Sequence, residues 1–139
     1  MTSENVLFDN LFISAPNNMG GLLALFDDDV MVVDDRPTCG LCWNQAQEIF
    51  VRAIQHSDRV VITTPRETKE ISGDWGDLHD VLVVADDLYI VSTQHNTVVR
   101  WSLSKNAEAE RIVLSTIEDS WHINCLGVLS GDLCFTAFG

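Results

Sequence analysis

The chain has 139 residues, which is enough for one domain with a hydrophobic core. Apolar residues make up 46% of the chain, which excludes a wholly disordered protein, and the formal net charge is -13. The few Lys and Arg residues form no cluster that could offset this charge, so we expect neither nucleic acid nor an anionic membrane as a partner.

Short runs rich in β-branched and aromatic residues recur along the chain and predict strands, because Asp, Asn, Gly or Pro residues bound them. In chain order, we expect strands over residues 11–15, 22–25, 30–33, 59–64, 79–84, 88–93, 97–103, 111–115, 122–128 and 133–137. Residues 44–54 have some helical character but fit a strand at least as well. We expect residues 104–111 to form a helical turn or a charged loop, and residues 65–80 to form one long connection.

Three of these predicted strands repeat one pattern, in which three apolar or aromatic residues are followed by small ones. They are Leu11–Ala15, Leu88–Ser92 and Leu133–Ala137. Repetition of this kind indicates a repeat architecture. Leu88 and Leu133 are 45 residues apart, and four short strands in a unit of that size are typical of a propeller blade. A β-sandwich would give a similar strand spacing, but the repetition favours a propeller.

We therefore expect a single all-β domain over residues 1–139, built from β-propeller-type blades of four antiparallel strands. The approximate blades are residues 1–64, 65–115 and 116–139, the last one incomplete. About three blades are too few to close a ring. Because unpaired strand edges invite another chain, we expect a homo-oligomer that completes the ring, and a fragment of a longer propeller is the alternative.

Four segments along the chain carry a family resemblance. They are Asn17–Leu22, Asp34–Leu41, Asp74–Val81 (Asp-Trp-Gly-Asp-Leu-His-Asp-Val) and Asp119–Leu126, which contains Trp-His-Ile-Asn-Cys-Leu. They resemble a bacterial family of propeller-like proteins known as a domain of unknown function. The resemblance covers nearly the whole chain and implies a propeller fold without an established activity. Members of that family are about twice as long as this chain, so the resemblance does not extend to ring closure within one chain.

Two histidines at predicted strand starts are the strongest candidates for chemistry. His79 and His122 open the first strand of successive units, and in a propeller that strand lines the central channel. We predict that they lie at the channel mouth as catalytic acid–base groups, or as ligands of a divalent metal. Asp80 and Asn124 are predicted to be neighbouring ligands that bind through oxygen. The alternative is that each histidine only holds the strand entry by a hydrogen bond to a loop.

Three further residues are predicted to contact a ligand. Trp75 and Trp121 precede the two histidines and could form an aromatic wall, although packing between blades is the alternative. Arg36 could bind a carboxylate at the channel mouth, although a salt bridge to Asp34 or Asp35 is the alternative.

The remaining polar and thiol groups predict little chemistry. Cys39 and Cys42 form a lone CxxC pair, and without a second such pair we expect buried free thiols and no zinc site. Residues 27–29 are three aspartates without the pattern of a calcium-binding loop, so we expect a hairpin turn. His56 and His95 lie in turn-like segments and receive no predicted role.

These observations lead to one hypothesis and two alternatives. The hypothesis is a propeller protein that binds a small molecule at the channel mouth, with a metal-assisted hydrolase or lyase as its catalytic form. The alternatives are a non-catalytic protein-interaction or structural module and a truncated fragment of a longer propeller. The N-terminus lacks the basic segment of a signal peptide, so we expect a cytoplasmic protein.

Overall fold

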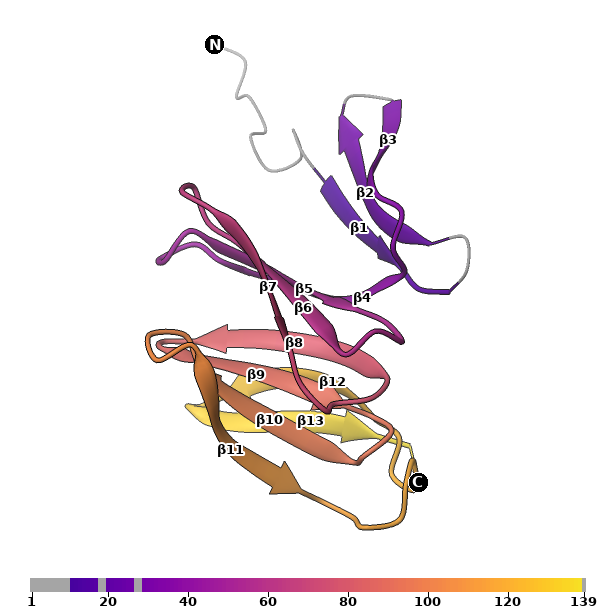
Figure 1. Cartoon of the computed structure of the whole chain (residues 1–139), viewed down its shortest axis with the longest axis vertical. Coiled ribbons are helices and arrows are strands. Elements are labelled where there is room, and N and C mark those ends of the chain that lie inside the picture. Colours follow the sequence, from indigo (N-terminus) through magenta and orange to yellow (C-terminus); the bar gives the residue numbers. More distant parts are fainter. Residues whose placement is uncertain (1–10, 18–19, 27–28, 139) are drawn as a thin grey trace.

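A computed structural model describes residues 11–17, 20–26 and 29–138. These residues form thirteen strands in four antiparallel sheets (Figure 1). No helix in this part of the chain is long and apolar enough to span a membrane. The predicted all-β fold is therefore confirmed.

Each sheet pairs its strands in chain order, so that neighbours in sequence are neighbours in space. The first sheet contains β1 (Leu11–Ala15), β2 (Gly21–Phe26) and β3 (Asp29–Asp34). The second contains β4 (Thr38–Asn44), β5 (Ile49–Ile54), β6 (Arg59–Thr63) and β7 (Thr68–Ser72). The third contains β8 (Leu78–Val84), β9 (Asp87–Ser92), β10 (Thr97–Ser102) and β11 (Ala107–Val113). The fourth contains β12 (Ile123–Leu129) and β13 (Asp132–Ala137).

Two predicted loops contain strands. β7 lies inside the segment 65–80, which we expected to be one long connection, and it pairs with β6 so that the second sheet ends at Ser72. β11 begins at Ala107, where we expected a helical turn or a charged loop. Both strands lie at the outer edge of a sheet. Their backbones pair with the neighbouring strand, but most of their side chains are polar and face solvent. The alternating hydrophobic pattern that predicts a strand is therefore weak in both.

The sheets stack with their first strands adjacent, because β8 packs against β4 on one side and against β12 on the other. Figure 1 shows the first sheet at the end of the molecule opposite the third and fourth sheets. The main core lies between the second and third sheets. Its buried residues include Val51, Val60, Ile62, Leu88, Ile90 and Val99.

Successive residues of one strand enter two different cores. In β9, Leu88 and Ile90 face the second sheet, whereas Tyr89 and Val91 pack toward the fourth sheet. A strand that is covered on both faces has an apolar residue at almost every position. This double burial explains why the pattern Leu-Tyr-Ile-Val was so clear in the sequence.

Candidate functional site

The first strands of the second, third and fourth sheets share one irregularity in their pairing. It shows which residues of these strands correspond to one another. In β4, β8 and β12 the pairing shifts by one residue just after the strand begins. Because the bulges lie at equivalent places, the second residues of these strands correspond to one another. The residues that directly precede each strand correspond in the same way. The second residues are Cys39, His79 and Asn124.

The predicted match between His79 and His122 is corrected by this register. His122 precedes the first residue of β12 and corresponds to Asp77, not to His79. Both Asp77 and His122 have a positive φ, of 39° and 40°, which supports the correspondence. The spacing in the sequence already indicated this offset of two residues, since the two histidines are 43 residues apart in a repeat of 45.

The two histidines nevertheless lie together in space. Their ring centroids are 5.1 Å apart and the rings meet edge to face, at 86°. The side chain of His79 is mostly buried, with 14% of its surface exposed, whereas His122 keeps 40% exposed. One residue comes from the start of β8 and the other from the loop before β12, so the contact joins the third and fourth sheets.

A carboxylate orients each ring of this pair. His79 Nε2 lies 3.1 Å from Asp77 Oδ2, and His122 Nδ1 lies 2.7 Å from Asp119 Oδ1. Because an ionised carboxylate only accepts hydrogen bonds, each of these nitrogens is the donor, and the carboxylate leaves the second nitrogen of each ring unengaged. His56 joins the group, with its Nδ1 3.3 Å from Asp77 Oδ1.

All four histidines of the chain approach carboxylates in this way. His95, in the turn between β9 and β10, has ring nitrogens 3.8 Å from an Asp74 oxygen and 3.9 Å from a Glu118 oxygen. These contacts are too long for hydrogen bonds but within the range of ion pairs. His56 and His95 come from equivalent turns, after the second strand of each sheet. Sequence reasoning assigned them no role, because nothing near them in the chain points to these partners.

Asp80 has a different role from the predicted one of ligand or acid–base group. Its Oδ1 accepts a hydrogen bond from its neighbour, Val81 N–H, at 2.9 Å, and its Oδ2 accepts one from Leu126 N–H, at 2.7 Å. Leu126 belongs to β12, so the carboxylate ties two adjacent sheets together. Burial raises the pKa of Asp80, and the two backbone hydrogen bonds partly offset this effect.

The two tryptophans have opposite environments. Trp75 has no exposed surface and packs edge to face on Trp101, with ring centroids 5.9 Å apart, so its predicted place in a ligand wall is corrected to a core position. Trp121 keeps 45% of its surface exposed beside His122, and its backbone N–H donates to Asn96 Oδ1 at 2.9 Å. Asn124 is half-buried at the position that corresponds to His79.

Arg36 is engaged within the chain. Its Nη2 lies 2.8 Å from Asp34 Oδ2 and its Nη1 lies 2.6 Å from Glu70 Oε1. The alternative of a salt bridge is therefore the one that the structure shows. These carboxylates raise the pKa of Arg36, and the same pairing holds the pKa of Asp34 well below its usual range.

The cysteines are free thiols in the part of the chain that the structure describes. Burial raises the pKa of Cys39 to about 11 and also raises the pKa of Cys42, so neither is an activated thiolate at neutral pH. Within residues 11–17, 20–26 and 29–138, no three His, Cys, Asp or Glu side chains are grouped so that they could hold a metal ion.

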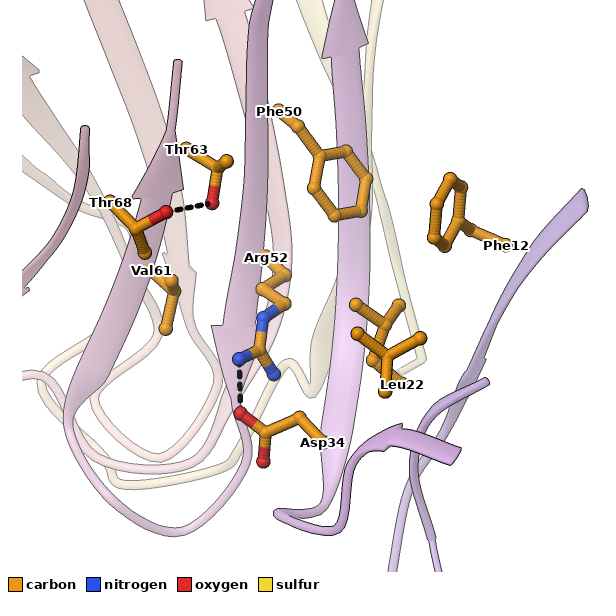
Figure 2. Close-up of a pocket in the computed structure, with 9 residues that line it drawn as sticks. Phe12, Leu22, Asp34, Phe50, Arg52, Val61, Thr63 and Thr68 are labelled. Carbon is orange, nitrogen blue, oxygen red and sulfur yellow. Dashed lines mark hydrogen bonds and ion pairs between the residues drawn. The ribbon is translucent and has the colours of Figure 1, made fainter. Parts of the chain in front are cut away.

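A pocket of about 340 Å³ lies between the first and second sheets, away from the histidines (Figure 2). Phe12 and Phe50 line one part of it, with ring centroids 5.5 Å apart. Arg52 and Asp34 form an ion pair in another part, and Arg52 Nη1 also donates to Thr38 Oγ1 at 3.3 Å. The charged groups are thus paired with each other and leave an apolar space.

Comparison with solved structures identifies the architecture. Virginiamycin B lyase from Staphylococcus aureus matches 94% of this chain with a TM-score of 0.69 and 12% sequence identity. A luciferin-regenerating enzyme matches 99% of the chain with a TM-score of 0.69 and 11% identity, and a chain of a nidogen/laminin complex matches 77% with a TM-score of 0.63 and 16% identity. The chain has a β-propeller-type fold.

This propeller-type chain is shorter than its structural neighbours. It spans 46% of the virginiamycin B lyase chain, 57% of the luciferin-regenerating enzyme and 44% of the chain in the nidogen/laminin complex. No protein-family model and no curated protein matches its sequence. The likeness therefore concerns the fold alone.

Proposed function

We propose that the protein binds a small molecule at the channel mouth, where His79 and His122 act as a general acid–base pair. The observation that carries this proposal is the contact of the two rings at 5.1 Å, each ring held by its own carboxylate. A carboxylate that orients a histidine stabilises the imidazolium form while a proton is transferred. Two such units side by side can supply a base and an acid to one reaction.

The free nitrogens define the chemistry of the pair. Asp77 engages Nε2 of His79, which leaves Nδ1 as its base, and Asp119 engages Nδ1 of His122, which leaves Nε2. In a hydrolysis, one imidazole would take a proton from the attacking water while the protonated form of the other gave a proton to the leaving group. An elimination would use the same two steps on a carbon acid and a leaving group. Both classes match the predicted hydrolase or lyase.

The charge around the pair limits the class of ligand. Asp77, Asp119 and the half-buried Asp80 surround it, and the whole chain has a net charge of -13. Arg36 is paired with Asp34 and Glu70, and is therefore not free to bind an anion. We therefore propose a neutral or cationic ligand, with Trp121 as an exposed aromatic surface beside it.

The named enzymes among the structural neighbours, a lyase and a luciferin-regenerating enzyme, are compatible with this proposal but share only the fold. A divalent metal, which the sequence analysis allowed, would need donors beyond the two histidines. We therefore assign proton transfer to the histidines themselves.

Hydrolysis of p-nitrophenyl acetate, a neutral activated ester, tests the acid–base role. We expect the variant His79→Gln/His122→Asn to hydrolyse it at least about tenfold more slowly than the wild type, since positioned acid–base groups contribute at least that much. Asn is chosen at position 122 because it tolerates the positive φ there. The matched control is His95→Gln, which also removes a histidine near carboxylates and should retain the wild-type rate.

Equal rates in the wild type and the double variant, with unchanged circular dichroism, would remove the basis of the acid–base proposal. The second candidate function, a non-catalytic structural module, would then be favoured. A specific observation supports that candidate, because large apolar side chains are exposed on the first and fourth sheets, among them Val30, Val32 and Leu129.

A further inference from the structure

One face of the first sheet is aliphatic and has no covering sheet in the described part of the chain. The register places six side chains on this face, opposite the face on which Phe12 contacts Phe50 of the second sheet. They are Leu11, Ile13, Leu23, Leu25, Val30 and Val32. We call this surface the leading face. Val30 and Val32 are 63% and 61% exposed, although sheets that face water normally carry polar residues there.

One face of the fourth sheet also has no covering sheet in the described part of the chain. Leu126 and Leu133 pack toward the third sheet, so the residues that alternate with them point away from it. We call this surface the trailing face, and it consists of Gly127, Leu129, Cys134 and Thr136, with Asp132 at its hairpin end. Leu129 is 69% exposed, and a Cβ added to Gly127 would meet nothing within 4 Å.

The equivalent faces of the second and third sheets each pack against the next sheet along the chain. At Gly40 in β4, an added Cβ would lie 2.4 Å from Asp80 Cα in the next sheet. Cys42 Sγ accepts a hydrogen bond from Val83 N–H of that sheet at 3.3 Å. Asp80 in turn reaches Leu126 N–H of the sheet that follows. The second and third sheets therefore both pack this face against a neighbouring sheet. The trailing face has the same position on the fourth sheet, so a neighbouring sheet can pack against it in the same way.

We propose that a second copy of the chain covers both faces, with the trailing face of each copy packed against the leading face of the other. Two faces on one chain that fit each other in this order form a head-to-tail contact, and a two-fold axis closes it into a ring. One chain spans 44% to 57% of three propeller-type chains, so two copies together have about the length of one such chain.

The composition of the two faces favours the same occupant. The leading face has no charged residue and the trailing face has only Asp132, in a chain whose net charge is -13. A large exposed apolar patch such as the leading face marks a protein interface in soluble proteins. The dimer would carry a charge of -26, twice -13, so its association should strengthen as salt screens the repulsion between copies.

Sedimentation equilibrium of the full chain tests the proposal. We expect a mass of about twice 15.5 kDa for the wild type, and a larger dimer fraction as NaCl is added. Val32→Asp on the leading face and Leu129→Asp on the trailing face should each give monomers. The matched control is Ile117→Asp, in the loop between β11 and β12, where the side chain is 71% exposed; it should remain dimeric.

Mixing the two monomeric variants separates a head-to-tail ring from other dimers. A Val32→Asp copy keeps its trailing face and a Leu129→Asp copy keeps its leading face, so one intact interface forms and heterodimers should appear. A wild-type protein that sediments as a monomer would by itself overturn the proposal. It would equally be overturned if the two folded variants remained dimeric alone, or if they failed to associate when mixed.

Discussion

Arg52→Ala is expected to lower the free energy of unfolding by about 3 kcal/mol, because removal of one partner from a buried ion pair leaves the other without full compensation. Only 8% of the Arg52 side chain is exposed, and it joins Asp34 at the end of β3 to Thr38 at the start of β4. Asp34 would keep Arg36, which also pairs with Glu70 of β7, but would lose its direct contact with β5. Urea denaturation followed by circular dichroism measures the change.

Arg59→Ala is the matched control on the neighbouring strand. Arg59 is 57% exposed and forms a single ion pair with Glu70 at 3.3 Å, so its loss should cost no more than about 0.5 kcal/mol. If Arg52→Ala proved no more destabilising than Arg59→Ala, the ion pair with Asp34 would not be what holds the first two sheets together.

Asp80→Ala is the second large effect that we expect, with a loss of about 3 kcal/mol in the free energy of unfolding. The substitution leaves two partly buried N–H groups, those of Val81 and Leu126, without acceptors, and a buried group left unpaired costs about 1–3 kcal/mol. Asp35→Ala, at an exposed position between β3 and β4, should change the stability by less than about 0.5 kcal/mol. Similar losses for the two variants would contradict the role of Asp80 as a tie between sheets.

The same carboxyl gives a pH test with a defined sign. Its pKa in the folded state is raised above its usual value, so the stability linked to its titration is full below that usual value and is lost as the pH rises through the folded pKa. Asp80→Asn cannot titrate. We therefore expect the stability of the wild type relative to Asp80→Asn to fall as the pH is raised from acid toward neutral, in denaturant titrations at matched ionic strength.

The parts of the fold that could be predicted are those where both faces of a strand are buried. Leu88–Ser92 has apolar side chains in two cores, and the resulting pattern repeats clearly enough to indicate blades. The edge strands could not be predicted in the same way. Residues 107–110 are Ala-Glu-Ala-Glu, which favour a helix by propensity, and only pairing with β10 makes them a strand.

The candidate site was predicted in part. His79 and His122 were selected as residues near strand starts, and the structure brings their rings into contact. Their equivalence was wrong because the bulge cannot be read from residue types, although their separation of 43 residues, two short of the repeat of 45, indicated the offset. Asp77 and Asp119 were missed as partners, although each lies two or three residues before its histidine.

The contact between His79 and His122 is the central claim, and nuclear Overhauser spectroscopy with ¹³C-labelled histidine tests it most directly. Edge-to-face rings with centroids 5.1 Å apart place ring protons of one close to the face of the other. We predict a cross-peak between the two rings that disappears in both His79→Gln and His122→Asn. The absence of that cross-peak in the folded wild-type protein would contradict the register and the site built upon it.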